Sequence, residues 1–76
     1  MTDRLPSLRP KVVLRVLERA GFTVVRTSGS HCRLIYHTDP NRKVTIPMHN
    51  NDLKRGTLRS IIAQAGLTVQ EFIELL

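Results

Sequence analysis

Apolar residues recur three or four positions apart in three segments of the chain, which is the spacing of one face of a helix. The segments are residues 7–20, 57–65 and 69–76. Gly21 and Gly66 come directly after the first two segments, and glycine often ends a helix because it adopts a left-handed conformation without strain. The pattern therefore predicts two amphipathic helices and a third, shorter one.

The predicted helices also have start signals. Ser7 can cap the first helix, and Pro10 then lies in its first turn, where the missing N–H costs nothing. Thr68 and Glu71 have the spacing of a capping box, in which each side chain accepts a hydrogen bond from the backbone N–H of the other residue. We therefore expect the first helix to occupy residues 7–20 and the last to begin just after Thr68.

Three short segments between the first two helices are rich in β-branched residues and predict strands. They are residues 22–27, 31–37 and 43–46. Ser28 and Gly29 form a turn between the first two strands, and residues 38–41 are of types that favour a second turn. Connections this short join neighbouring strands in an antiparallel arrangement.

The resulting order is αβββα with a short C-terminal helix, which is an α+β fold. We expect a three-stranded antiparallel sheet with helices on one face and solvent on the other. The chain of 76 residues is long enough for one hydrophobic core, so residues 1–76 are expected to form a single domain.

Positive charge dominates the sequence. Twelve Lys and Arg residues stand against six Asp and Glu, which gives a formal net charge of +6. Such a balance in a small domain indicates a polyanionic partner, with nucleic acid first and an acidic protein second. The two phenylalanines and one tyrosine are too few for a platform on which successive bases stack, which disfavours a single-strand binder of that kind.

No apolar run approaches the roughly 20 residues that cross a bilayer. The start of the chain also lacks the apolar stretch of a secretory signal. Cys32 is the one cysteine, so no internal disulfide can form. These features predict a protein of the reducing cytoplasm that has no membrane partner.

His31 is the leading candidate for chemistry. It follows a small, flexible Ser-Gly-Ser turn at the start of a predicted strand, and Arg33, Ile35 and His37 share its face because side chains alternate along a strand. A histidine in that place can meet a phosphate, then take a proton from a ribose 2′-hydroxyl or give one to a leaving oxygen. A solvated surface histidine is the more common meaning of this local pattern taken alone.

The possible metal ligands do not converge. His31 and Cys32 point to opposite faces of one strand, the length of that strand separates His31 from His37, and His49 lies in a later loop. Cys32 is expected to be buried. No Asp or Glu cluster is present to hold magnesium. We therefore predict no metal and no cofactor; a nuclease of this kind requires RNA, which carries its own 2′-hydroxyl nucleophile.

Basic residues gather in three parts of the chain. They are Arg26, Arg33, Arg42 and Lys43 on or beside the strands, Lys54, Arg55 and Arg59 around the start of the second helix, and Arg9, Lys11, Arg15 and Arg19 on the first helix. A helix N-terminus attracts phosphate through its free N–H groups and its dipole, so the second group is a candidate phosphate site. The third group also fits an ordinary solvated helix face.

Residues 60–76 resemble a DNA-binding helix-turn-helix in their pattern. The helix that would enter the groove, however, contains Glu71 and Glu74 and no Lys or Arg. Negative charge is unfavourable for a helix that lies against phosphates. We therefore expect no direct, specific binding of DNA.

Several segments together resemble the HicA toxins of HicA–HicB toxin–antitoxin systems, also called YcfA-like proteins. The matching segments are residues 17–22 (LERAGF), 26–31 (RTSGSH), 44–47 (VTIP), 54–61 (KRGTLRSI) and 65–66 (AG). The resemblance extends over roughly residues 7–70. The Gly-Ser-His step and the Gly-Thr-Leu-Arg-x-Ile step, in this order and spacing, are together fairly specific.

The resemblance implies a fold similar to a double-stranded RNA-binding domain, in agreement with the predicted αβββα order. It also implies cleavage of mRNA without a metal, which stops translation, and a HicB antitoxin that covers the catalytic histidine. His31 falls at the family's catalytic histidine, with Gly29 and Ser30 in the motif before it. We expect RNA phosphates to be bound by Arg26, Arg33, Lys43, Lys54, Arg55 and Arg59.

Two other functions remain compatible with the sequence. A non-catalytic module that binds double-stranded RNA would have the same fold and charge, and replacement of His31 by alanine would change its behaviour little. An adaptor for an acidic protein would have the same charge, and competing RNA would not affect its binding.

Overall fold

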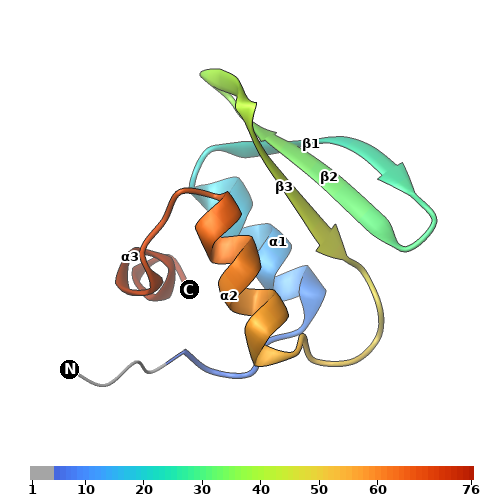
Figure 1. The fold of residues 1–76 in the computed structure, drawn as a ribbon, viewed down its shortest axis with the longest axis vertical. Helices are drawn as coiled ribbons and strands as arrows, with labels where there is room; N and C mark the ends of the chain where they lie inside the picture. Colours follow the sequence, from blue (N-terminus) through green and yellow to red (C-terminus); the bar gives the residue numbers. More distant parts are fainter. Residues whose placement is uncertain (1–4) are drawn as a thin grey trace.

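Residues 5–76 are described by a computed structural model, shown in Figure 1. The elements are α1 (Pro10–Arg19), β1 (Phe22–Ser28), β2 (His31–Tyr36), β3 (Asp39–Pro47), α2 (Arg55–Gln64) and α3 (Val69–Glu74). This order confirms the predicted α+β fold. Residues 1–4 of the predicted domain lie outside the described residues.

α1 begins later than predicted, and Pro10 is the reason. Pro10 is the first residue of the helix, and a proline disfavours helical geometry in the residue before it. Arg9 is accordingly extended, with φ −81° and ψ 153°, and it is an N-cap without a side-chain hydrogen bond. The predicted Ser7 cap is therefore wrong. The segment before Arg9 is instead joined to a later loop, where the N–H of Leu53 donates to the carbonyl of Leu8 (2.8 Å).

The predicted helix ends and the last helix start are confirmed. Gly21 and Gly66 have positive φ angles of 108° and 74°, just after α1 and α2. At α3, the Thr68 hydroxyl accepts a hydrogen bond from the N–H of Glu71 (3.0 Å), and the Glu71 carboxylate accepts one from the N–H of Thr68 (2.8 Å). The capping box therefore fixes the start of α3.

The three strands form one antiparallel sheet in the order β1-β2-β3, as predicted. The second turn lies at residues 37–38 rather than 38–41, so β3 begins earlier than expected, at Asp39. Pro40 is accommodated because β3 is an edge strand, where a missing ladder donor is tolerated. The Asp39 carboxylate accepts the N–H of Asn41 (3.0 Å), and the pairing with β2 shifts here, so residues 40–42 have no partner in the register.

α1 and α2 pack on one face of the sheet, and α3 packs beside α2 (Figure 1). The core consists of strand residues Phe22, Cys32, Leu34, Val44 and Ile46, which face helix residues Val13, Val16, Leu17, Leu58, Ile61, Ile62 and Phe72. Burial of each large apolar side chain contributes about 1.5–3 kcal/mol. None of the helices in residues 5–76 has the length and hydrophobicity that a membrane span requires.

Arg42 connects β3 to the end of α2. Its guanidinium carbon lies 4.3 Å from the ring centroid of Tyr36, and its Nε donates to the carbonyl of Ala65 (2.7 Å). A cation at this end of a helix also meets the negative pole of the helix dipole. Arg42 therefore belongs to the scaffold on the helix side of the sheet.

Candidate functional site

The open face of the sheet consists of rows of residues that lie opposite one another on neighbouring strands. In β2 every second side chain points to this face, beginning with His31. The register adds one residue from β1 and one from β3 to each row. The histidine row is Ser28, His31 and Pro47, the arginine row is Arg26, Arg33 and Thr45, and the isoleucine row is Thr23, Ile35 and Lys43.

A β-bulge in β1 brings Arg26 to the open face. The pairing with β2 shifts between Val24 and Arg26, which leaves Val25 as an extra residue. In a regular strand Arg26 would point to the same side as Val24, toward the helices, because side chains alternate. The bulge moves this alternation by one position. Arg26 consequently lies opposite Arg33, and Ser28 follows on the same face.

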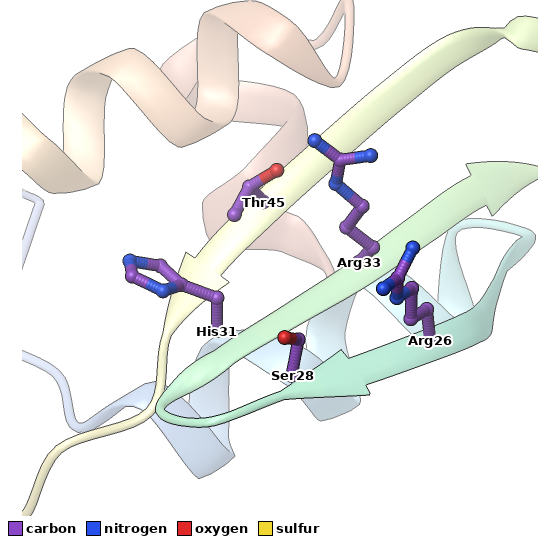
Figure 2. A pocket seen from close by; sticks show the side chains of 5 residues that line it. All are labelled: Arg26, Ser28, His31, Arg33 and Thr45. Atoms are coloured by element: carbon purple, nitrogen blue, oxygen red, sulfur yellow. The ribbon is translucent and has the colours of Figure 1, made fainter.

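A hollow of about 400 Å³ lies over the histidine and arginine rows. Figure 2 shows its lining side chains, Arg26, Ser28, His31, Arg33 and Thr45, on one side of the three strands. The structure thus brings together three of the predicted site residues. The sequence analysis missed Ser28 and Thr45, whose hydroxyl groups complete the lining. The signal that would have found them is the strand register, which places Ser28 opposite His31 and Thr45 opposite Arg33.

The electrostatics of this hollow favour an anion. Within residues 5–76 no carboxylate pairs with Arg26 or Arg33, although the two residues are cross-strand neighbours. Like charges in that arrangement repel each other, and a bound anion relieves the repulsion. His31 is exposed, and in the same described range its imidazole has no hydrogen-bond partner. The nitrogens of this ring are therefore accessible to a ligand.

The turn before His31 holds the histidine in place. Gly29 has a φ of 58°, a conformation that glycine adopts without strain. A Cβ at Gly29 would meet no atom within 4 Å, so the backbone angle rather than space requires glycine. The carbonyl of Ser30 accepts the N–H of Met48, which ties the turn to the residue after β3.

The predicted basic residues of α2 do not line the hollow. Lys54 is the N-cap of α2, and Arg55 is its first residue. The Arg55 guanidinium donates to the carbonyl of Leu5 (2.5 Å), so it helps to hold the segment before α1. Arg59 lies one turn further along α2. Because α2 packs on the covered face of the sheet, these three residues form a basic region separate from His31.

His37 does not share the open face with His31, contrary to the sequence prediction. β2 ends at Tyr36, and His37 lies in the following turn. There its Nδ1 is 3.0 Å from the carbonyl oxygen of Gly21, and its ring centroid is 4.7 Å from that of Tyr36. Cys32 is buried, as predicted. In the part of the chain that the structure describes, no three His, Cys, Asp or Glu side chains gather as a metal site.

The basic residues of α1 are partly engaged in structural contacts. Arg9 forms an ion pair with Asp52 (3.7 Å). Arg19 donates to the carbonyl of Leu75 (2.7 Å) and so holds the chain after α3 against α1. The Arg19 contact supports a scaffold role for Arg19, whereas the Arg9 pair is exposed and contributes little to stability.

The family model described as the HicA toxin of bacterial toxin–antitoxin systems matches residues 11–67, three quarters of the chain. No curated protein was found to match. The matched range contains all three strands, α2, all of α1 except Pro10, and every residue that lines the hollow. The chain therefore belongs to the HicA toxin family, the toxins of bacterial toxin–antitoxin systems, in which an antitoxin is the partner.

Proposed function

We propose that this toxin is a metal-independent endoribonuclease that cleaves mRNA and thereby inhibits translation. The observation that carries the proposal is the single hollow in which His31 lies with Arg26 and Arg33. Histidine is suited to proton transfer, and arginine binds phosphate oxygens through paired hydrogen bonds. Since RNA supplies its own nucleophile, such a site needs only to move protons and to stabilise negative charge.

In the proposed reaction the ribose 2′-oxygen attacks the adjacent phosphorus, and the bond from phosphorus to the next 5′-oxygen breaks. The products are a 2′,3′-cyclic phosphate and a free 5′-hydroxyl. His31 either takes the proton from the 2′-hydroxyl as general base or gives a proton to the leaving 5′-oxygen as general acid. Water takes the second role, because the hollow contains one histidine.

Arg26 and Arg33 would hold the non-bridging oxygens of the reacting phosphate, where negative charge increases in the transition state. The absence of a carboxylate partner for either guanidinium among residues 5–76 supports this assignment. Gly29 and Ser30 would position His31 through the turn. We assign Lys43, Lys54, Arg55 and Arg59 to phosphates farther along the RNA, since none of them lines the hollow.

We further propose that the partner is a HicB-type antitoxin that covers the open face and shields His31 from RNA. The exposure of His31 and the net charge of +6 support an acidic protein as the inhibitor. Because the substrate is mRNA, both proteins would act in the cytoplasm.

The test is incubation of the purified toxin with a defined RNA in excess EDTA. We expect cleavage with cyclic phosphate ends, and no cleavage of the DNA of the same sequence. Cleavage that stops in EDTA and returns with magnesium would contradict the metal-independent mechanism. Tight binding of double-stranded RNA without cleavage would identify a non-catalytic binding module instead.

A further inference from the structure

A second hollow, of about 260 Å³, adjoins the first on the open face. It has Arg26 and Arg33 in common with the first hollow, and its other lining residues are Val25, Leu34, Ile35 and Lys43. The two hollows therefore form one continuous surface. This surface runs along the strands from the histidine row, over the arginine row, to the isoleucine row.

The second hollow is lined by both aliphatic and cationic side chains. Val25 is the bulge residue, and 53% of its surface is exposed. Ile35 belongs to the isoleucine row, opposite Lys43. In residues 5–76 neither Lys43 nor the two shared arginines pair with a carboxylate. A nucleotide within an RNA strand matches this chemistry, because its base offers apolar surface and lies between two phosphates.

The spacing of the rows supports the same ligand. Successive rows are two strand residues apart, about 6.6 Å at the usual rise of a β-strand. That distance is similar to one nucleotide step of an extended single strand. If the reacting phosphate lies at the arginine row, the next phosphate on the side away from His31 would reach Lys43. The nucleoside between these phosphates would then lie over Val25 and Ile35.

We propose that Val25 and Ile35 form a subsite for the nucleoside adjacent to the reacting phosphate, and that Lys43 binds the phosphate beyond it. This inference rests on the proposed ribonuclease function and names how its substrate is held. Aliphatic side chains provide no hydrogen-bond pattern that tells one base from another. The subsite therefore requires a base but does not select which base.

The test uses binding rather than cleavage, so that its failure is separate from failure of the ribonuclease proposal. The probe is a fluorescent RNA hexamer with 2′-O-methyl groups, which cannot be cleaved, and its positions are made abasic one at a time. We expect Val25→Ala with Ile35→Ala to weaken binding of the intact hexamer about fivefold, because less apolar surface is buried against the base. For the one hexamer whose missing base would occupy the subsite, the double variant and the wild type should have equal affinity.

Three further variants make the result interpretable. Val25→Ala alone, at an exposed residue, should show a smaller effect at the same position, whether or not the double variant is destabilised. Val12→Ala is the control, because Val12 is an exposed valine on α1, and it should bind as the wild type does. Lys43→Ala should weaken binding of the intact hexamer. This loss of affinity should disappear when a methylphosphonate neutralises one phosphate beside the base that contacts Val25 and Ile35.

Several outcomes would overturn the subsite. One is that the double variant and the wild type differ in affinity by the same factor for every abasic hexamer, or do not differ for any hexamer. Another is a double variant that binds RNA normally but binds the antitoxin more weakly, which would assign Val25 and Ile35 to the protein interface. If the expected pattern appears but unmodified RNA is not cleaved, the subsite stands and the cleavage proposal fails.

Discussion

Arg26 and Arg33 lie directly opposite each other across β1 and β2, and in residues 5–76 neither has a carboxylate partner. Like charges in this position destabilise a sheet by roughly 0.2–1 kcal/mol. Arg26 occupies the position only because Val25 forms a bulge. The fold therefore maintains a charge repulsion that contributes nothing to its own stability.

Replacement of both arginines by alanine should separate binding from stability. The logarithm of the binding constant decreases with the logarithm of the salt concentration. We expect this slope to become less steep by about 0.7 for each phosphate of single-stranded RNA that the variant no longer neutralises. The urea midpoint should stay unchanged or rise, because the repulsion is removed. Arg15→Ala on α1 is the control. An unchanged slope would mean that the phosphates bind to another basic region. In that case Lys54→Ala with Arg55→Ala should make the salt dependence less steep.

His31→Ala tests the proposed proton transfer. General acid–base catalysis by a histidine contributes about 10²- to 10⁴-fold to rate, so the variant should lose cleavage by that factor and lose toxicity in cells. The side chain is exposed and has no hydrogen-bond partner among the described residues, so stability should change by no more than about 0.5 kcal/mol. RNA affinity should remain within a few-fold of the wild type, measured by anisotropy.

His37→Ala and His49→Ala are matched controls for the proposed catalytic role of His31. Neither lines the hollow, and His37 contacts the Gly21 carbonyl instead. Both variants should retain cleavage per folded molecule. If one of them abolishes cleavage while the fold is intact, a mechanism with two histidines would replace the one-histidine mechanism.

Gly29→Ala should lower stability through backbone strain alone. A left-handed conformation costs a residue with a Cβ roughly 1–2 kcal/mol, and the new methyl group would meet no atom within 4 Å. Urea unfolding measures the loss. Gly29→Asn should recover part of it, since asparagine tolerates this region. Equal stability of the alanine and glycine proteins would show that the turn relaxes to another geometry.

Arg42→Lys should destabilise the protein without affecting RNA cleavage. The planar guanidinium of Arg42 stacks on Tyr36 and also donates to the carbonyl of Ala65. Lysine has no planar group that can make both contacts. We expect a loss of about 1–2 kcal/mol in urea unfolding, the range for a hydrogen bond from a charged group plus a cation–π contact. Cleavage per folded molecule should be unchanged. A selective loss of cleavage would place Arg42 among the residues that bind the substrate.

The antitoxin should protect His31 from chemical modification. If the antitoxin covers the open face, diethyl pyrocarbonate should modify His31 in the free toxin but not in the complex, as read by mass spectrometry. His37 is the internal reference, because it lies in the turn beyond the far end of β2. Salt should slow association more than it speeds dissociation. An inactive complex in which His31 still reacts would contradict inhibition by direct covering.

The fold could be predicted from the sequence because its signals are local. Apolar spacing located the helices, Gly21 and Gly66 marked their ends, and Thr68 with Glu71 marked the start of α3. The predicted start of α1 was wrong because Pro10 disfavours a helical conformation at Arg9, and this effect outweighed the capping preference of Ser7. Local preferences of this kind compete, and only the stronger one appears in the structure.

The candidate site could be predicted only in part. Alternation along β2 placed His31 and Arg33 on one face, which requires no knowledge of the other strands. Arg26, by contrast, reaches that face through a bulge, and Thr45 joins it through the register of β3. Bulges and register depend on how two strands pair with each other, so they cannot be predicted from the residue pattern of one strand alone.

The pleat of the sheet gives the two sides of one strand different freedom to vary. In β2, Cys32 and Leu34 are in the core, while His31, Arg33 and Ile35 face outward. Substitutions on the outward side do not require the core to repack. A point change on this side can therefore alter the surface that the toxin presents to its partners, while the hydrophobic core keeps its packing.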